Sequence, residues 1–306
     1  MSQIGRNPRF RGYQQQDAHE FLLYVLDRLD KECLENCPKS DNEPKTNSDI
    51  SFSRIRTMIS KNHASIIANI FGGVLQDEVN CLECGFKSHK QDPFMDLSLD
   101  IPLQKATNSN VSNMNNWSND ATPSSNSDNS NQSSCNSTAG TTNTTTTSDS
   151  CHLIDCLSSF IELEELTETE LYYCSNCQQK QRSTKRFWIR RLPDVLCLHL
   201  KRFRYNNFLR TKIDDYIKFP IQGLDMKRFV MANKHETRGS SCGPTIYDLV
   251  AFIEHHGSGL GSGHYTAYCR HDGCWFHFDD SNVTACDEST VRQSKAYILF
   301  YNRRSS

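Results

Sequence analysis

The residues with the clearest chemical potential lie between His255 and Asp280, in the segment HHGSGLGSGHYTAYCRHDGCWFHFDD. Four glycines surround the approach to His264, which opens an alternating run, and a second short run ends in Asp279 and Asp280. The Asp-Gly pair between the runs is typical of the turn of a hairpin. Such a hairpin would bring the His264 imidazole beside the Asp279 carboxylate. A histidine oriented by a carboxylate is the base of a nucleophilic enzyme.

The same glycines allow a second interpretation, a phosphate-binding loop. They lead into a strand pattern and not into a helix, and no Lys-Ser or Lys-Thr pair follows them, so the sequence argues against a P-loop. A single histidine in a loop is more often structural than catalytic. For His264, the flanking glycines, the acid in hairpin register and the nearby aromatic residues favour catalysis.

Two C-x-x-C pairs predict a metal centre. Cys81-Leu-Glu-Cys84 and Cys174-Ser-Asn-Cys177 each offer two thiolates, and together they can complete the tetrahedral four-thiolate site of one structural zinc ion. The long segment between the pairs is tolerable, because the entropic cost of closing a loop grows slowly with its length. One C-x-x-C alone would also fit a redox motif, but the second pair favours a zinc ribbon.

Composition excludes several classes of protein. The 306 residues carry a net charge of -2 and a pI near 6.6, which gives no general attraction to nucleic acid or membrane. No apolar run reaches the roughly 20 residues that a membrane span needs. The first residues, MSQIGRNPRFRGYQQQ, are too polar for a secretory signal. We therefore expect a cytosolic or nuclear protein, in which the fourteen cysteines are reduced.

A helix is predicted after Asp17. The stretch Asp17-Ala-His-Glu20 resembles a capping box, and apolar residues then recur at helical spacing at Phe21, Leu22, Val25, Leu26 and Leu29. The glutamines at 14–16 are either a polar start of this helix or part of a ligand site. The residues alone favour the polar start.

The rest of the ordered sequence predicts an α+β fold, with a mixed, mostly antiparallel sheet and helices to one side. A helix-like apolar face begins near Cys156, and Lys201 and Arg202 are expected to be solvated. Short strands are expected in five ranges: Ile66–Leu75, Pro93–Ile101, Pro193–Phe203, Thr245–Glu254 and Ala296–Tyr301.

An insert divides the chain. Residues 104–150 are almost wholly Asn, Ser and Thr, and such a segment cannot bury enough apolar area to offset its ordering entropy, so we expect it to be disordered. We predict three parts: 1–103 with partial thumb helices and half of the fingers, the insert, and 151–306 with the other half of the fingers and the palm.

These motifs together resemble the ubiquitin-specific proteases, cysteine proteases of papain-like fold that cut after the C-terminal glycine of ubiquitin. GSGHYTAYCR with WFHFDDSNV resembles their histidine box, and GYQQQDAHEFLLYVLD resembles their glutamine-rich helix start. LCLHLKRF with Phe219-Pro220 is similar to their palm strands, and the two C-x-x-C pairs are similar to the zinc ribbon of their fingers. The residues of these motifs are especially similar to those of the subgroup that removes ubiquitin from core histones, whose members carry a separate N-terminal zinc finger.

The resemblance implies a role for individual residues. His264 would be the general base, Asp279 its orienting partner and Asp280 a neighbouring polar support. Three further residues would bind the extended ubiquitin tail: Gln15, Asp17 and Tyr265. The fold implied is a papain-like α+β fold with a zinc-ribbon fingers subdomain, lacking much of the N-terminal thumb.

One element of the family pattern has no counterpart here. The family nucleophile lies in a box Asn-x-Gly-Asn-Thr-Cys, upstream of the QQQDAHEF segment, and the 306 residues contain no such box. Among the internal cysteines, Cys156 near a helix start is the least unsuitable substitute. We expect a truncated, inactive catalytic domain of a nuclear deubiquitinating thiol protease. The alternative is a genuinely inactive ubiquitin-binding module, and a nucleic-acid-binding zinc ribbon is disfavoured by the near-neutral charge.

Overall fold

The computed structural model describes residues 10, 15–35, 65–102, 151–206, 209–231, 244–259 and 261–305. The chain divides into two units, and the unit formed by Met1–Pro102 and Ser150–Ser306 contains every element below. The second unit, Leu103–Asp149, lies outside the described residues, as does the whole of the predicted disordered insert, 104–150.

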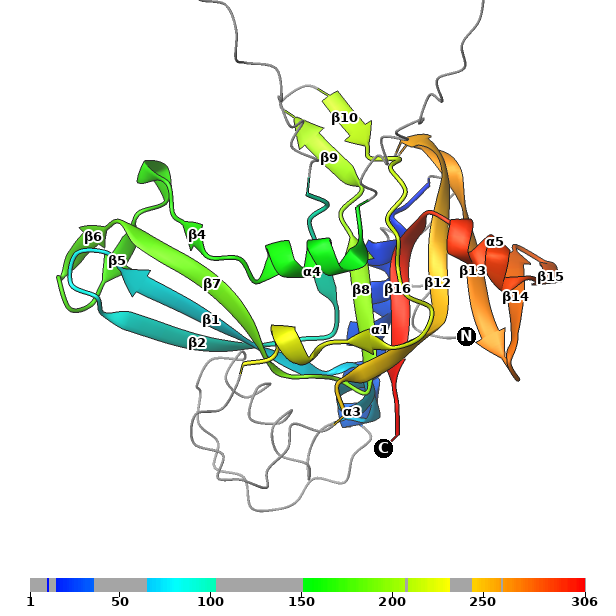
Figure 1. Cartoon of the computed structure of the whole chain (residues 1–306), viewed down its shortest axis with the longest axis horizontal. Helices are drawn as coiled ribbons and strands as arrows, with labels where there is room; N and C mark the ends of the chain where they lie inside the picture. Colours follow the sequence, from blue (N-terminus) through cyan, green and yellow to red (C-terminus); the bar gives the residue numbers. More distant parts are fainter. Residues whose placement is uncertain are drawn as a thin grey trace, which may run out of the picture. The chain divides into compact units, whose positions relative to one another are not determined.

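An eight-stranded sheet forms the palm of the molecule (Figure 1). Its strand order is β15-β14-β13-β12-β16-β8-β3, with β11 added beside β12. Among the described strands of this sheet, β3 and β8 form the one parallel pair. The strands are β3 (Leu97–Leu99), β8 (Val195–Leu200), β11 (Leu224–Asp225), β12 (Ile246–Gly259), β13 (Ser262–His271), β14 (Cys274–Asp279), β15 (Asn282–Cys286) and β16 (Ala296–Arg303).

The hydrophobic core lies against the palm. Leu196, Leu198 and Leu299 are fully buried, and so is Leu157 of α4 (Leu153–Phe160). The expectation that Arg202 is solvated is wrong, since only 1% of it is exposed. Its guanidinium donates to the carbonyls of Ala296, Ile213 and Asp215 at 2.8 to 3.0 Å. Carbonyl acceptors can make burial of a cation tolerable.

The fingers are a second sheet, of strand order β2-β1-β7-β4. In Figure 1, β1, β2 and β7 run side by side, and the two-stranded β5–β6 sheet lies at their end. The bounds are β1 (Gly73–Cys81), β2 (Lys87–Phe94), β4 (Glu164–Glu165), β5 (Tyr172–Cys174), β6 (Gln179–Gln181) and β7 (Ser183–Arg191). One half of the fingers therefore precedes the insert, and the other half follows it.

The remaining elements are short, apart from one helix. They are α1 (Ala18–Glu35), α3 (Ile66–Phe71), α5 (Glu288–Gln293), the 3-10 turns η3 (Glu168–Glu170) and η4 (Lys227–Phe229), and the hairpin of β9 (Phe203–Asn206) and β10 (Leu209–Lys212). None of the helices in the described part of the chain is both long and apolar enough to span a membrane.

The predicted strand over Ile66–Leu75 is wrong in its first half, which is helix α3. Ser65 begins this helix, because its Oγ accepts a hydrogen bond from the Ala68 backbone N–H at 3.0 Å. The strand β1 starts only at Gly73. The predicted strand at Pro93–Ile101 is likewise two strands, β2 ending at Phe94 and β3 starting at Leu97.

Candidate functional site

The predicted hairpin is present, and it brings His264 and Asp279 together. β13 pairs with β14 from Ala267↔Phe278 to the turn, where Asp272 and Gly273 have φ of 48° and 81°. Asp-Gly tolerates this conformation, which matches the twist of the strands. His264 Nε2 lies 2.5 Å from Asp279 Oδ1.

Each member of the pair shifts the pKa of the other in the direction that a general base and its orienting acid require. The hydrogen bond to Asp279 raises the pKa of His264, and the same contact lowers the pKa of the Asp279 carboxyl group. Both side chains are nearly half exposed. Because Nε2 faces the carboxylate, Nδ1 is the ring nitrogen left for proton transfer. Asp280 follows at the strand end with φ of 50°, and its charge also raises the pKa of His264.

The loop before His264 is packed closely on β12. A Cβ atom at Gly263 would lie 2.3 Å from His255 Nε2, so this position requires glycine. The side-chain amide of Gln15 donates to the Gly263 carbonyl. The structure thus places Gln15, from the start of the first helix, directly beside the residue that precedes His264.

Asp17 is fixed through both of its carboxylate oxygens. Oδ1 accepts from the backbone N–H groups of His19 and Glu20 at 2.7 and 3.2 Å, which confirms the predicted helix cap. Oδ2 accepts from the buried Tyr297 hydroxyl at 2.7 Å. Tyr265 is close by, with its ring 6.2 Å from that of Tyr297. Burial, and then the nearby charge of Asp17, raise the pKa of Tyr265 to about 12. A carboxylate oxygen has a second lone pair, so Asp17 can still accept from a ligand.

The cysteines near the palm are not positioned as nucleophiles. Within the part of the chain that the structure describes, the groups beside the His264 ring are the carboxylates of Asp279 and Asp280, and no thiol contacts it. Cys156 is fully buried in α4, and burial raises its pKa strongly. An un-ionised, enclosed thiol is inert.

The four predicted zinc ligands converge at the end of the fingers. Cys81 Sγ is 4.0 Å from Cys177 Sγ, and Cys84 Sγ is 3.6 Å from Cys174 Sγ. A tetrahedral zinc ion with bonds of about 2.3 Å separates its sulfur ligands by roughly 3.8 Å. The four atoms all lie within 4.8 Å of one another. The thiolate set therefore fits a zinc ion in both number and spacing.

The two C-x-x-C pairs have the same backbone hydrogen bond and a residue of positive φ at the same place in the turn. Gly85 N–H donates to the Cys81 carbonyl at 2.9 Å, and Gln178 N–H donates to the Cys174 carbonyl at 2.8 Å. Gly85 and Gln178 both have positive φ, of 69° and 59°. Hydrogen bonds from the Phe86 backbone and then from Asn176 lower the pKa of Cys84 to about 6.

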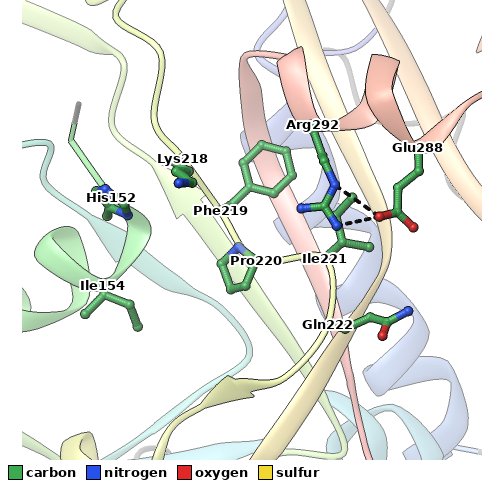
Figure 2. A pocket seen from close by; sticks show the side chains of 9 residues that line it. All are labelled: His152, Ile154, Lys218, Phe219, Pro220, Ile221, Gln222, Glu288 and Arg292. Carbon is green, nitrogen blue, oxygen red and sulfur yellow. Dashed lines mark hydrogen bonds and ion pairs between the residues drawn. The ribbon is translucent and has the colours of Figure 1, made fainter. Parts of the chain in front are cut away.

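A cavity of about 480 Å³ lies away from these residues (Figure 2). The sticks in Figure 2 come from the start of α4, the segment before β11, and α5, where Arg292 forms an ion pair with Glu288. None of the predicted site residues lines it.

Sequence reasoning missed a cluster beneath α1. His19 Nε2 lies 2.9 Å from Asp96 Oδ2, and its ring stacks on His199 at 3.7 Å. Burial lowers the pKa of His199 to about 3, so this ring is neutral. Parallel rings cannot both aim their in-plane lone pairs at one ion, and the cluster therefore joins α1 to the palm without a metal. Only the polar side chains inside LHL and DLSL hinted at it.

The comparisons with known proteins decide the family. A family model described as ubiquitin carboxyl-terminal hydrolase matches residues 3–301. The chain belongs to this family. It is 46% identical to Ubiquitin carboxyl-terminal hydrolase 3 of Mus musculus over 299 residues, covering 98% of this chain and 51% of the relative. It is 37% identical to Ubiquitin carboxyl-terminal hydrolase 22 of Bos taurus over 312 residues, covering 96% of this chain and 51% of the relative.

Solved structures agree with the family. The structure of the SAGA Ubp8/Sgf11/Sus1/Sgf73 DUB module bound to ubiquitin aldehyde matches with a TM-score of 0.64 and 28% identity, covering 96% of this chain and 50% of that one. The predicted papain-like α+β fold is confirmed. The family is one of cysteine-type ubiquitin hydrolases. The chain spans about half the length of the curated relatives it matches.

Proposed function

We propose that this chain supplies the base, its orienting acid and the tail-binding groups of a deubiquitinating thiol protease. The reaction is hydrolysis of the peptide or isopeptide bond after the C-terminal glycine of ubiquitin. The observation that carries the proposal is the His264–Asp279 contact of 2.5 Å beside a loop that Gln15 also reaches. Family membership supports the same reaction class.

In this proposal His264 takes the proton of a cysteine thiol through Nδ1, while Asp279 holds the ring and stabilises the imidazolium. The thiolate attacks the carbonyl carbon of the ubiquitin glycine, and the imidazolium returns the proton to the departing amine. Water activated by the neutral imidazole then hydrolyses the thioester. We assign the thiol to a cysteine box in a longer form of the protein, since no described cysteine contacts His264.

The ubiquitin tail would be held by Gln15, Asp17 and Tyr265. Asp17 has a fixed orientation and an oxygen with spare accepting capacity, which suits a backbone N–H of an extended peptide. Tyr265 packs between His255 and Tyr297, at ring distances of 4.8 and 6.2 Å, and can form one wall of the tail channel. Ubiquitin, ubiquitinated proteins and among them core histones are the proposed partners, and the nucleus the proposed location.

The fingers would hold one structural zinc ion through Cys81, Cys84, Cys174 and Cys177. The ion would join the β1–β2 turn to the β5–β6 turn and add no catalytic step. The ubiquitin-bound solved relative supports ubiquitin as ligand of this fold.

The test is hydrolysis of a fluorogenic ubiquitin C-terminal amide by a form of the protein long enough to carry the cysteine box. His264→Ala should lower kcat by about 10³-fold, the scale on which a positioned base contributes. His271→Ala is the matched control, because this ring is 78% exposed at the hairpin turn and serves no proposed step. Hydrolysis that persists at full rate in His264→Ala would refute the assignment of the base.

A second candidate function is a ubiquitin-binding module without catalysis. It is favoured by the absence of any thiol contact to His264 within the described residues. The 306-residue chain should bind ubiquitin in either case, so binding alone does not separate the two. Binding without hydrolysis by the longer form would establish the module.

A further inference from the structure

A buried lysine lies against the loop that leads to His264. Lys212 ends β10, and only 6% of its side chain is exposed. Its ammonium donates to the carbonyl of His255 at 2.9 Å and to that of Gly257 at 2.7 Å. It also faces Asp214, whose Oδ1 is 3.2 Å away. The three donors of the ammonium therefore each have an acceptor.

The two carbonyls flank the residue opposite the base. His256 pairs with His264 in the β12–β13 ladder, and the register shifts between His256 and Gly259. Gly257 has φ of 117°, and a Cβ there would lie 2.8 Å from the Gly263 Cα and the Ser262 carbonyl oxygen. The backbone thus leaves the regular ladder at the point where Lys212 supplies outside donors. His255 is buried, and the carbonyl of a buried residue requires such a partner, whereas Gly257 is exposed.

The lysine is itself held by a second ion pair, which its partner Asp214 forms. Asp214 Oδ2 lies 2.5 Å from Lys295 Nζ, and contacts with Lys295 and then Lys212 lower the pKa of the Asp214 carboxyl group. Phe203, in the same hairpin as Lys212, packs edge-on against the His255 ring at 5.2 Å. The β9–β10 hairpin therefore contacts the end of β12 through the Lys212 ammonium and through the Phe203 ring.

We propose that Lys212 is a positioning residue, which ties the β9–β10 hairpin to the irregular end of β12 and fixes the backbone opposite His264. This inference deepens the proposed function and rests on it for the role of His264. Hydrogen bonds from a charged donor are stronger than neutral ones, and removing the ammonium leaves two carbonyls without this donor. The end of β12 then loses these two hydrogen bonds, while the backbone hydrogen bonds between the strands of the sheet remain.

Amide hydrogen exchange on the 306-residue chain tests the proposal. Lys212→Met keeps the aliphatic stem and removes the donors. Exchange at residues 256–259 and 261–264 should become about tenfold faster or more, with exchange in β8 and β16 unchanged within about twofold. Lys218→Met is the matched control, since Lys218 is exposed and its side chain has no ion-pair partner within the described residues; it should change neither region. Lys212→Arg, which keeps a charged donor, should restore most of the protection.

Two results would overturn the inference. One is loop exchange that is unchanged in Lys212→Met, and the other is an equal rise in the loop, β8 and β16, which would make Lys212 a general stabiliser only. If Lys212→Met does not fold, Asp214→Asn is measured instead, and its loop exchange should rise about threefold, because a charged partner of the ammonium is lost. No change there would also reject the proposal. These measurements need no ubiquitin and no thiol, so absent hydrolysis leaves them valid.

Discussion

At the scale of single residues, the chemistry depends on which groups the backbone brings within hydrogen-bond distance. His264 and Asp279 could be paired from the sequence, because a period of two and an Asp-Gly turn determine a hairpin register. Tyr297 could not be predicted as a partner of Asp17, since the two lie 280 positions apart. Contacts of that separation depend on tertiary packing, which no local pattern encodes.

The proton affinity of His264 provides the first prediction. Its folded-state pKa is raised by Asp279, so the stabilisation from this contact is present below the ordinary pKa of histidine and is lost as pH rises through the raised pKa; it is also lost at low pH, as pH falls through the lowered pKa of Asp279. In Asp279→Asn the NMR titration midpoint of the His264 ring should fall toward the ordinary value of histidine. Asp272→Asn, at the exposed turn, should leave the midpoint in place. An unchanged midpoint in Asp279→Asn would show that the contact does not form in solution.

At the scale of elements, the presence of a strand could be predicted from the sequence better than the residues at which it begins and ends. The mostly apolar run of β8 and the alternation in β13 are unambiguous patterns, and both strands are present. The error at Ile66 arose because IIANIF has strand-like composition, whereas Ser65 provides a helix cap that only its side-chain geometry reveals. Local propensity is a weak guide when a cap and a tertiary contact act together.

The fingers carry the second prediction, on metal content. The purified chain should hold one zinc ion, and Cys174→Ser should remove it and expose the amides of β5 and β6 to exchange, because three ligands bind zinc far more weakly than four. Atomic emission gives the zinc content per chain. Cys274→Ser, at an exposed cysteine of β14, is the control and should keep one equivalent. Full zinc content in Cys174→Ser would contradict the four-thiolate site.

At the scale of the whole molecule, the fold class could be predicted, but the polar contacts between distant segments could not. The carbonyl of Ile101 accepts from the Arg204 side chain, and the carbonyl of Cys151 accepts from the Lys218 backbone at 2.9 Å. Both borders of the 104–150 insert are therefore tied down, one to the β9–β10 hairpin and the other to the segment before β11, by contacts that involve no residue of the insert. Neither contact has a signature in the sequence.

These ties lead to the prediction for the insert. Replacing residues 104–150 by a short Gly-Ser linker should leave the midpoint of thermal unfolding within about 2 °C, because a shorter flexible loop changes the closing entropy little. Circular dichroism melting of the two forms measures this. A fall of ten degrees or so would show that the insert contributes to the folded core.

The positions of the finger strands along the chain also determine which of them the ribosome synthesises before the insert and which after it. β1 lies between β2, which follows it directly, and β7, which is made only after the insert. The thiols of Cys81 and Cys177 are likewise separated by 96 positions. A nascent chain must therefore carry a two-stranded hairpin with an open edge and half of the four-cysteine cluster through the synthesis of a long polar stretch. Such an edge invites pairing with other chains, and an Asn/Ser/Thr-rich stretch, which has little tendency to bury itself, offers it no competing apolar partner.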